Sequence, residues 1–199
     1  MIIKASYFLI YAVLIIFLSG CLDKDHKKIV VQQTDGFYKE VYIVYKDSIK
    51  DGKYIKFYPD GKMWDSCAYK MNKLEGQRKL FSKTGQAEII ENYKNGVMDG
   101  DYFVLYPDGK PKLQQTYVDG VLTGISYGYH PNGNLKEKVT MKNNEENGGF
   151  EEYYEDGKLH WKGTYLNGDN EQDTLFEYSP DGKLIKKMLC QMGVCHTIK

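Results

Sequence analysis

Polar and apolar residues alternate along most of the chain, and the alternation has a period of two. After a turn at Gly157, for example, Leu159 and Trp161 are apolar, whereas His160 and Lys162 are polar. The same alternation follows the other recurring turns. A period of two is typical of β-strands in an antiparallel sheet that has one buried face and one wet face. The pattern therefore predicts an all-β protein.

Three acidic residues interrupt the apolar positions near the middle of these strands, namely Asp65, Glu91 and Glu137. The alternation assigns them to the inward face, together with neighbours such as Cys67 and Tyr93. The assignment of alternate residues to the inward face is therefore least regular at these three positions.

Glycines recur at a fixed interval after residue 36. In one series the numbering rises in equal steps of 24, with a last step of 25, and its members are Gly61, Gly85, Gly109, Gly133, Gly157 and Gly182. In a second series every step is 24, and its members are Gly52, Gly76, Gly100, Gly124 and Gly148. A shift of a single residue would break both series. An internal period of this length predicts a repeat protein.

Each unit contains two turn signals. The first has Pro, then Asp or Asn, then Gly, as in the segment Tyr58-Pro59-Asp60-Gly61, and this order is typical of a hairpin that ends in a glycine bulge. The second is shorter, as in Asn95-Gly96. Two short strands cannot bury themselves in water, so neighbouring units have to stack. The sequence predicts an antiparallel β-hairpin solenoid of about six 24-residue repeats, which form one elongated twisted sheet.

Aromatic residues recur at one strand position of the repeat, where Tyr69, Tyr93, Tyr117, Met141 and Tyr165 follow one another. Stacked units would turn them into a ladder, and core packing is the expected use of most of them. The alternative is that the tyrosine and lysine stripe binds a glycan or a peptide. The segment Ile29–Val31 and the loop between Cys190 and Cys195 are candidate caps for the two ends of the sheet.

The start of the chain differs from the rest. Lys4 precedes an apolar run over residues 5–18, and Leu18-Ser19-Gly20-Cys21 follows. This order resembles the bacterial lipoprotein signal, and the resemblance implies a signal peptide at 1–20, lipidation of Cys21, a lipidated tether at 21–35 and a repeat domain at 36–199. Leu22 after the cysteine favours the outer membrane of the cell envelope by the same resemblance. The alternative is an uncleaved anchor helix.

Charge and cysteine usage narrow the function classes. Lys plus Arg and Asp plus Glu are 27 each, so no net field attracts nucleic acid. Cys190 and Cys195 are separated by four residues, and in an oxidising compartment they would form a disulfide. The alternative is a metal site that adds His196. Cys67 is expected to be a buried apolar residue.

No catalytic motif is found. The four histidines fall at different repeat positions, and His130 is expected to pack as a turn aromatic. The sequence contains no GxSxG, P-loop, HExxH or strand-linked GxGxxG motif. The turn aspartates, such as Asp60 and Asp108, suit the turns; cation binding is the alternative. We therefore expect a non-enzymatic protein without a metal or cofactor.

The unit that runs from Phe150 through Tyr153, Gly157 and Tyr165 to Gly168 resembles the MORN-repeat variant of bacterial proteins called the YwqK family. The resemblance covers about residues 36–189, and the unit at 76–99 departs most from it. It implies an antiparallel β-hairpin solenoid with a non-enzymatic role. The lipoprotein signal, the 24-residue period and the absence of a catalytic motif lead us to expect a lipid-anchored protein that binds a protein or an envelope polymer. Since members of this family are often labelled antitoxins, neutralisation of a partner toxin is the alternative function.

Overall fold

The computed structural model describes residues 24–32 and 39–199. The expected signal peptide at 1–20 and the lipidation site Cys21 lie outside these residues. In the described part of the chain, seventeen strands form one sheet. They are β1 (His26–Gln32), β2 (Lys39–Tyr45), β3 (Ile49–Phe57), β4 (Met63–Lys70), β5 (Lys73–Leu74), β6 (Gly76–Phe81), β7 (Ala87–Lys94), β8 (Val97–Met98), β9 (Gly100–Leu105), β10 (Pro111–Val118), β11 (Val121–Tyr129), β12 (Leu135–Lys142), β13 (Glu145–Tyr153), β14 (Leu159–Tyr165), β15 (Glu171–Tyr178), β16 (Leu184–Gln191) and β17 (Val194–Thr197).

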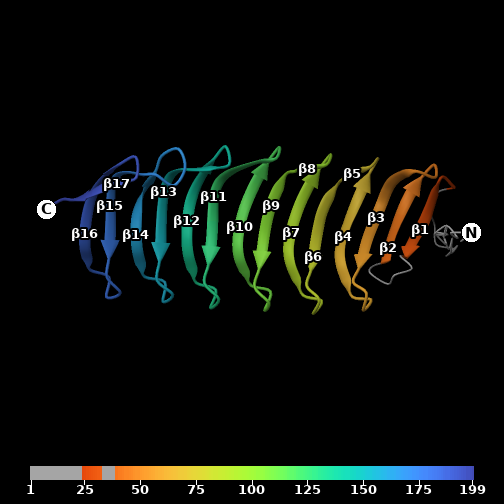
Figure 1. Ribbon diagram of the computed structural model, residues 1–199, viewed down its shortest axis with the longest axis horizontal. Helices are drawn as coiled ribbons and strands as arrows, with labels where there is room; N and C mark the ends of the chain where they lie inside the picture. Colours follow the sequence, from red (N-terminus) through yellow and green to blue (C-terminus); the bar gives the residue numbers. More distant parts are fainter. Residues whose placement is uncertain (1–23, 33–38) are drawn as a thin grey trace, which may run out of the picture.

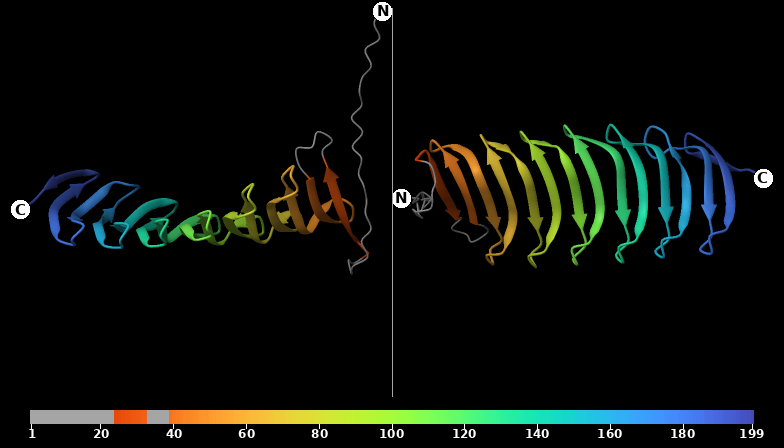
Figure 2. Two further views of the ribbon diagram at one scale, coloured as in Figure 1. Left: turned by 90° about the horizontal axis from the view of Figure 1, so that it is seen from below. Right: turned by 180° about the vertical axis from the view of Figure 1, so that it is seen from behind.

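The sheet is an antiparallel meander in which β4 pairs with both β5 and β6 and β7 pairs with both β8 and β9, so that the short strands β5 and β8 each pair with one strand only. The hairpins follow one another along a single axis, with β1 near one end and β17 at the other (Figure 1). Seen from the side, the strands of residues 26–32 and 39–197 form a single elongated and twisted layer (Figure 2). This confirms the predicted all-β hairpin solenoid. Among the described residues, the structure contains no helix long and apolar enough to cross a membrane.

The two kinds of turn lie on opposite edges of the sheet (Figure 1). At one edge, Gly109 donates its N–H to the carbonyl of Tyr106 at 2.8 Å, and Tyr106 donates to Lys110, which is the pattern of a hairpin with a glycine bulge. At the other edge, turns such as Asn95-Gly96 have positive φ at both central residues, 53° and 85°. These φ values define a two-residue type I′ turn, which matches the twist of the strands.

The type I′ turns also join each repeat to the previous one. In five of these turns, and in the longer loop that contains Asn167-Gly168, the second residue with positive φ donates its N–H to a carbonyl nearly one period earlier in the chain, as Gly120 does to Met98 at 2.8 Å. The backbone at this edge is thus hydrogen-bonded across repeats as well as within each hairpin. This linkage holds consecutive hairpins at one spacing and explains why the period tolerates so little variation.

Burial falls on one face of the sheet, which we call the inner face. Its buried residues include Tyr54, Cys67, Val139, Phe150 and Leu175, and the register pairs Tyr54 with Cys67 and Val139 with Phe150. No side chain among the described residues is less than 2% exposed. The core is therefore one layer of partly covered side chains and not an interior that is shielded from water on all sides. The opposite, outer face carries the polar residues of the alternating pattern, such as Lys138, Glu151 and Lys162.

The N-terminal part of the repeat array begins earlier than expected. Residues His26–Gln32 lie within the range assigned to a tether, but they form β1, which pairs with β2 from His26–Tyr45 to Gln32–Lys39. The physical reason is the apolar segment Ile29–Val31, which has a partner strand to pair with. This segment, expected as a candidate cap, is itself the first strand of the sheet.

Candidate functional site

The repeat-turn glycines line one edge of the sheet. All six adopt positive φ, between 82° and 94°, and they are Gly61, Gly85, Gly109, Gly133, Gly157 and Gly182. A side chain is strained in this conformation, so glycine is required by the turn itself. The structure thus gives these residues a structural role at the edge, and it spreads them over six hairpins rather than gathering them into one site.

The turn aspartates bond to their own turns. Asp108 accepts the backbone N–H of Lys110 at 3.1 Å, and its other oxygen lies 3.1 Å from the Lys110 ammonium. The backbone N–H and then the ammonium of Lys110 lower the pKa of Asp108. Asp156 repeats this arrangement with Lys158. Among the described residues, no group of three or more His, Cys, Asp or Glu side chains could hold a metal ion.

An aromatic hydroxyl links neighbouring repeats at this edge. Tyr106 donates to the carbonyl of Tyr129 at 2.7 Å, and Tyr58 and Tyr154 each make the same kind of bond to the repeat that follows them. His130 occupies the equivalent turn position, and its Nε2 donates to the carbonyl of Tyr153 at 2.9 Å. His130 therefore takes the place of the turn tyrosine and makes the same kind of hydrogen bond to the next repeat, which is a structural role.

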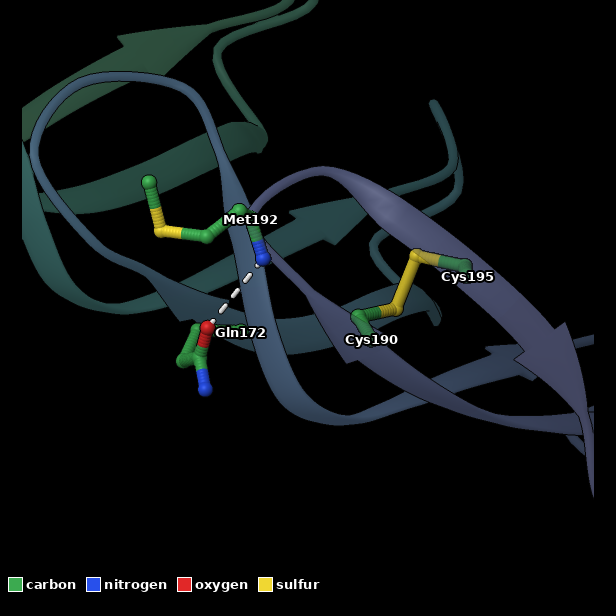
Figure 3. Close-up of a disulfide and its surroundings, with 4 residues drawn as sticks. All are labelled: Gln172, Cys190, Met192 and Cys195. Carbon is green, nitrogen blue, oxygen red and sulfur yellow. Dashed lines mark hydrogen bonds between the residues drawn. A yellow bond between two sulfur atoms is a disulfide. The ribbon is translucent and has the colours of Figure 1, made fainter.

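The C-terminal cysteines face each other on β16 and β17, and a disulfide joins them (Figure 3). The loop between them is tied to β15, because Met192 donates its backbone N–H to Gln172 Oε1 at 3.2 Å. With the sulfurs of Cys190 and Cys195 bonded to each other, the alternative metal site with His196 loses two of its three ligands. Cys67 is buried and free, and burial raises the pKa of its thiol to about 12.

The tyrosine ladder runs along the inner face. Each ladder residue pairs across the sheet with a glycine of the second series, as in Gly52–Tyr69, Gly76–Tyr93, Gly100–Tyr117, Gly124–Met141 and Gly148–Tyr165. These glycines have φ between 77° and 128° and lie where the strand bends. A side chain at Gly52 would meet Ile43, one at Gly100 would meet Asn92 and one at Gly148 would meet Thr140, whereas Gly76 and Gly124 have open space around them. The second series is therefore required by the positive φ of its members rather than by the facing rings.

At the N-terminal end of the inner face, an ammonium group lies among three rings. Lys50 Nζ is 5.0 Å from the ring centre of Tyr42, 4.7 Å from that of Tyr54 and 5.1 Å from that of Tyr69. Cation–π attraction operates at these distances. The inner face therefore surrounds one of the chain's own ammonium groups with aromatic rings, of which Tyr69 belongs to the ladder.

Further along the inner face, an ion triplet replaces apolar packing. The Arg78 guanidinium donates to both oxygens of Asp65, at 2.7 Å from Nη2 and 3.1 Å from Nε, and to Glu91 at 3.3 Å. Tyr93 adds a hydroxyl bond to Glu91 at 3.2 Å. Two of the three irregular positions in the sequence pattern, Asp65 and Glu91, are therefore the two partners of one arginine.

Near the C-terminal end, the inner face is hollowed. A pocket of about 210 Å³ lies between β13, β14 and β15, and its lining consists of Phe150, Glu152, Trp161, Tyr165, Glu171 and Leu175. The rings of Phe150 and Tyr165 stack at 4.0 Å between centres. Sequence reasoning missed this pocket, although the signal was present: carboxylates replace apolar residues at repeat-equivalent positions of the last two units.

Comparison with known proteins identifies the repeats. A family model described as MORN repeat variant matches four stretches, at residues 50–71, 98–119, 122–143 and 146–167. The starts of these stretches lie one or two periods apart, as the glycines do. The unmatched stretch between the first two contains the turn at Gly85, which lacks both Pro and Asp. No curated protein matches the chain.

The matches, the period and the sheet agree with one another. Each matched stretch covers one hairpin with its glycine-bulge turn in the middle. The four stretches lie between the start of β3 and the second residue after the end of β14, with residues 72–97 unmatched. Repeats of this family suggest a binding role, which the open inner face suits. The chain is therefore a repeat protein that contains four MORN-variant repeats between residues 50 and 167.

Proposed function

We propose that this protein is a lipid-anchored, non-catalytic protein of the cell envelope that binds a partner protein along its inner face. The observation that carries the proposal is the inner face itself, which presents three chemically different contact sites along its length, which we call stations. These stations are the tyrosine-bound Lys50, the Asp65–Arg78–Glu91 triplet and the acidic hollow at Glu152 and Glu171. A row of distinct stations discriminates between polypeptide sequences better than a uniform surface would.

The architecture favours a protein partner over a small molecule. Solenoid repeats create extended binding surfaces, whereas small-molecule sites are usually single enclosed cavities. The hollow on this face is open and holds about 210 Å³, which is below the ordinary size of a small-molecule site. The outer face offers paired charges instead, since Lys138 and Lys162 both contact Glu151. We therefore place the contact on the inner face.

The lipid anchor rests on the segment Leu18-Ser19-Gly20-Cys21. A thioether-linked diacylglyceryl group with an N-acyl chain on Cys21 would supply more than one chain, which stable anchoring needs. We expect the wild-type chain to enter the detergent phase when bacterial envelopes are extracted with a phase-separating detergent. A Cys21→Ser variant should stay in the aqueous phase or keep its signal peptide, and unchanged partitioning of that variant would contradict lipidation.

The binding role is tested by affinity capture. The tagged full chain is used as bait in detergent-solubilised envelope, and captured proteins are identified by mass spectrometry. A variant with Tyr117→Ala on the inner face should lose the partner, whereas Lys136→Ala on the outer face should retain it. Capture that is equal for both variants, or no enriched protein at all, would contradict the proposal. Protection of cells from a co-expressed toxin that is itself captured would assign the partner to the antitoxin class.

A further inference from the structure

The hollow near the C-terminal end of the inner face has the walls of a cation site. Its lining combines three aromatic side chains, Phe150, Trp161 and Tyr165, with the carboxylates of Glu152 and Glu171. Aromatic faces attract organic cations, and carboxylates accept hydrogen bonds from them. These side chains come from three consecutive strands, β13, β14 and β15, so the repeat stacking holds them together.

The two carboxylates have no partner within the described part of the chain. No hydrogen bond or ion pair to the side chain of Glu152 or Glu171 is present there, although other carboxylates of the sheet, such as Glu151 and Asp65, are paired. Burial, followed by the charges of the surrounding carboxylates, raises the pKa of Tyr165. Glu146 is one of the carboxylates that act on Tyr165, and burial and the charges of Asp169 and Glu137 raise the pKa of Glu146 as well. The hollow is thus a place of uncompensated negative charge.

The repeats supply an internal comparison for these carboxylates. The strand position of Glu146 and Glu171 holds apolar residues in the three preceding units, namely Leu74, Met98 and Leu122. The position of Glu152 and Glu177 holds Lys56, Leu80, Val104 and Gly128 in the four earlier units, so a carboxylate occurs there only in the last two. Packing alone would favour the apolar residue, because it needs no partner. The glutamates therefore gather around the hollow for a reason other than the stability of the sheet.

The N-terminal end of the inner face shows what the same arrangement binds. Tyr54 and Tyr69 stand four periods before Phe150 and Tyr165, and Lys50 stands four periods before Glu146. At the N-terminal end, the ammonium of Lys50 fills the aromatic site from within the chain, at 4.7 Å from Tyr54 and 5.1 Å from Tyr69. At the C-terminal end, this cation is replaced by a carboxylate, so a cation has to come from outside.

We propose that the hollow lined by Phe150, Glu152, Trp161, Tyr165 and Glu171 binds a lysine or arginine side chain of a polypeptide partner. An ammonium or guanidinium group has N–H donors for the two carboxylates, whereas a quaternary ammonium has none. A volume of about 210 Å³ accommodates the end of one side chain rather than a larger ligand. The polypeptide source rests on the function proposed above, and the cation chemistry rests on the hollow alone.

The test uses short probes and one spectroscopic reporter. The sequence contains two tryptophans, so a Trp64→Phe background leaves Trp161 as the sole indole. The full chain, purified in a maltoside detergent, is titrated with acetyl-Gly-Arg-Gly-amide and acetyl-Gly-Lys-Gly-amide, and the indole N–H resonance is followed by NMR. We expect saturable shifts with one or both charged probes and none with the uncharged analogue in which citrulline replaces arginine.

Matched variants separate the pocket from the rest of the sheet. Glu152→Gln and Glu171→Gln should each weaken probe binding about fivefold, which corresponds to the loss of one partly exposed ion pair. Glu145→Gln is the control, since Glu145 is exposed and faces Lys142 in the register, away from the hollow. Equal binding by all variants, or an equal response to the citrulline peptide, would overturn the proposal. A stronger response to choline than to arginine would also overturn it and assign the hollow to a lipid headgroup instead.

A stability readout distinguishes a binding role from a structural one. If the glutamates exist for binding, restoring the apolar residue of the earlier repeats with Glu152→Leu and Glu171→Leu should abolish probe binding and keep or raise the melting temperature. A lower melting temperature would show that the carboxylates hold the sheet together and would overturn the proposal. The probes need no partner protein, so the two proposals can fail separately. Failed affinity capture would contradict the proposed function but not the cation site in the hollow. Failed probe binding would contradict the cation site but not the proposed function.

Discussion

At the scale of single residues, the triplet of Asp65, Arg78 and Glu91 shows how a thin core tolerates charge. The side chains of Arg78, Asp65 and Glu91 are 28%, 11% and 13% exposed, so water does little to solvate them. Arg78 makes hydrogen bonds to both carboxylates, and these bonds raise its own pKa. Removing the arginine would leave two half-buried negative charges facing each other across the strands.

We therefore predict that Arg78→Met lowers the free energy of unfolding by about 3 kcal/mol, as removal of one partner from a buried ion pair does. Urea denaturation followed by circular dichroism measures the change. The control is Lys79→Met, because Lys79 is the neighbouring residue on the outer face and should change stability by less than about 0.5 kcal/mol. Equal effects of the two substitutions would show that the triplet contributes nothing specific.

Glu151 on the outer face carries the clearest pH dependence. Burial would raise the pKa of Glu151, but hydrogen bonds from Lys138, Tyr153 and Lys162 outweigh it and lower the pKa to about 2. A carboxyl group whose pKa is lowered on folding stabilises the protein above its unfolded pKa. This contribution is lost as the pH falls from about 4.5 towards 2.

We predict that wild type is more stable than Glu151→Gln by about 1 kcal/mol at pH 6, a value reduced for solvent screening because Lys138 and Lys162 are 38% and 54% exposed. The difference should shrink between pH 4.5 and pH 2. Thermal melts of both proteins across this range provide the measurement, and a difference that stays constant with pH would contradict the assignment.

At the scale of the hairpin, the hydrogen bond from a turn tyrosine to the next repeat can be tested with two matched substitutions, one that removes it and one that adds it. Tyr106→Phe removes only the hydroxyl that bonds to the Tyr129 carbonyl, and we predict a loss of about 1 kcal/mol. Ser82 occupies the same turn position in the unit without Pro and Asp. Ser82→Tyr should add the missing bond to the next repeat and raise the melting temperature. If neither change alters the melting temperature, the bond does not couple the repeats.

The same scale shows what could be predicted from sequence. The turns and their period were predictable because glycine with positive φ and Pro-Asp-Gly are local signals. Strand parity was predictable as well, since it follows from alternation. The hollow was not, because Glu151 and Glu152 are adjacent in sequence but lie on opposite faces, and Glu152 joins Trp161 only through the register of β13 and β14. Arg78 was missed as the partner of Asp65 for the same reason, since the two residues are 13 positions apart and meet only through the pairing of β4 and β6.

At the scale of the whole molecule, the sheet has a single layer, so each hairpin depends on its two neighbours for burial. The stability of such an array is the sum of the repeats and their interfaces. The number of repeats can therefore change without changing the fold, whereas the register cannot. One residue too many or too few within a strand would exchange the inner and outer faces of the strands beyond that point, whereas a longer loop absorbs the extra residue of the 25-residue step after β14.

This argument predicts the outcome of two deletions. Removing residues 100–123 joins Asp99 to Gly124, which occupies the position of Gly100 one period later. We expect a folded sheet that is about 10 Å shorter, since two strands are lost at roughly 4.8 Å each. Because the hollow at Phe150 and Trp161 lies outside the deletion, the variant should still bind the arginine peptide. Small-angle scattering, circular dichroism and the probe titration provide the measurements.

The second deletion, of residues 101–123, is one residue short of a full period and leaves Gly100 next to Gly124. The downstream strands then enter the sheet one residue out of step, and polar residues such as Lys138 would turn to the inner face while Val139 and Phe150 turn outward. Bulges at this strand could absorb the extra residue only by breaking ladder hydrogen bonds. We therefore expect the second variant to aggregate or to melt well below the first, although it retains one residue more. Equal stability of the two would mean that the period of the glycines does not determine which face is buried.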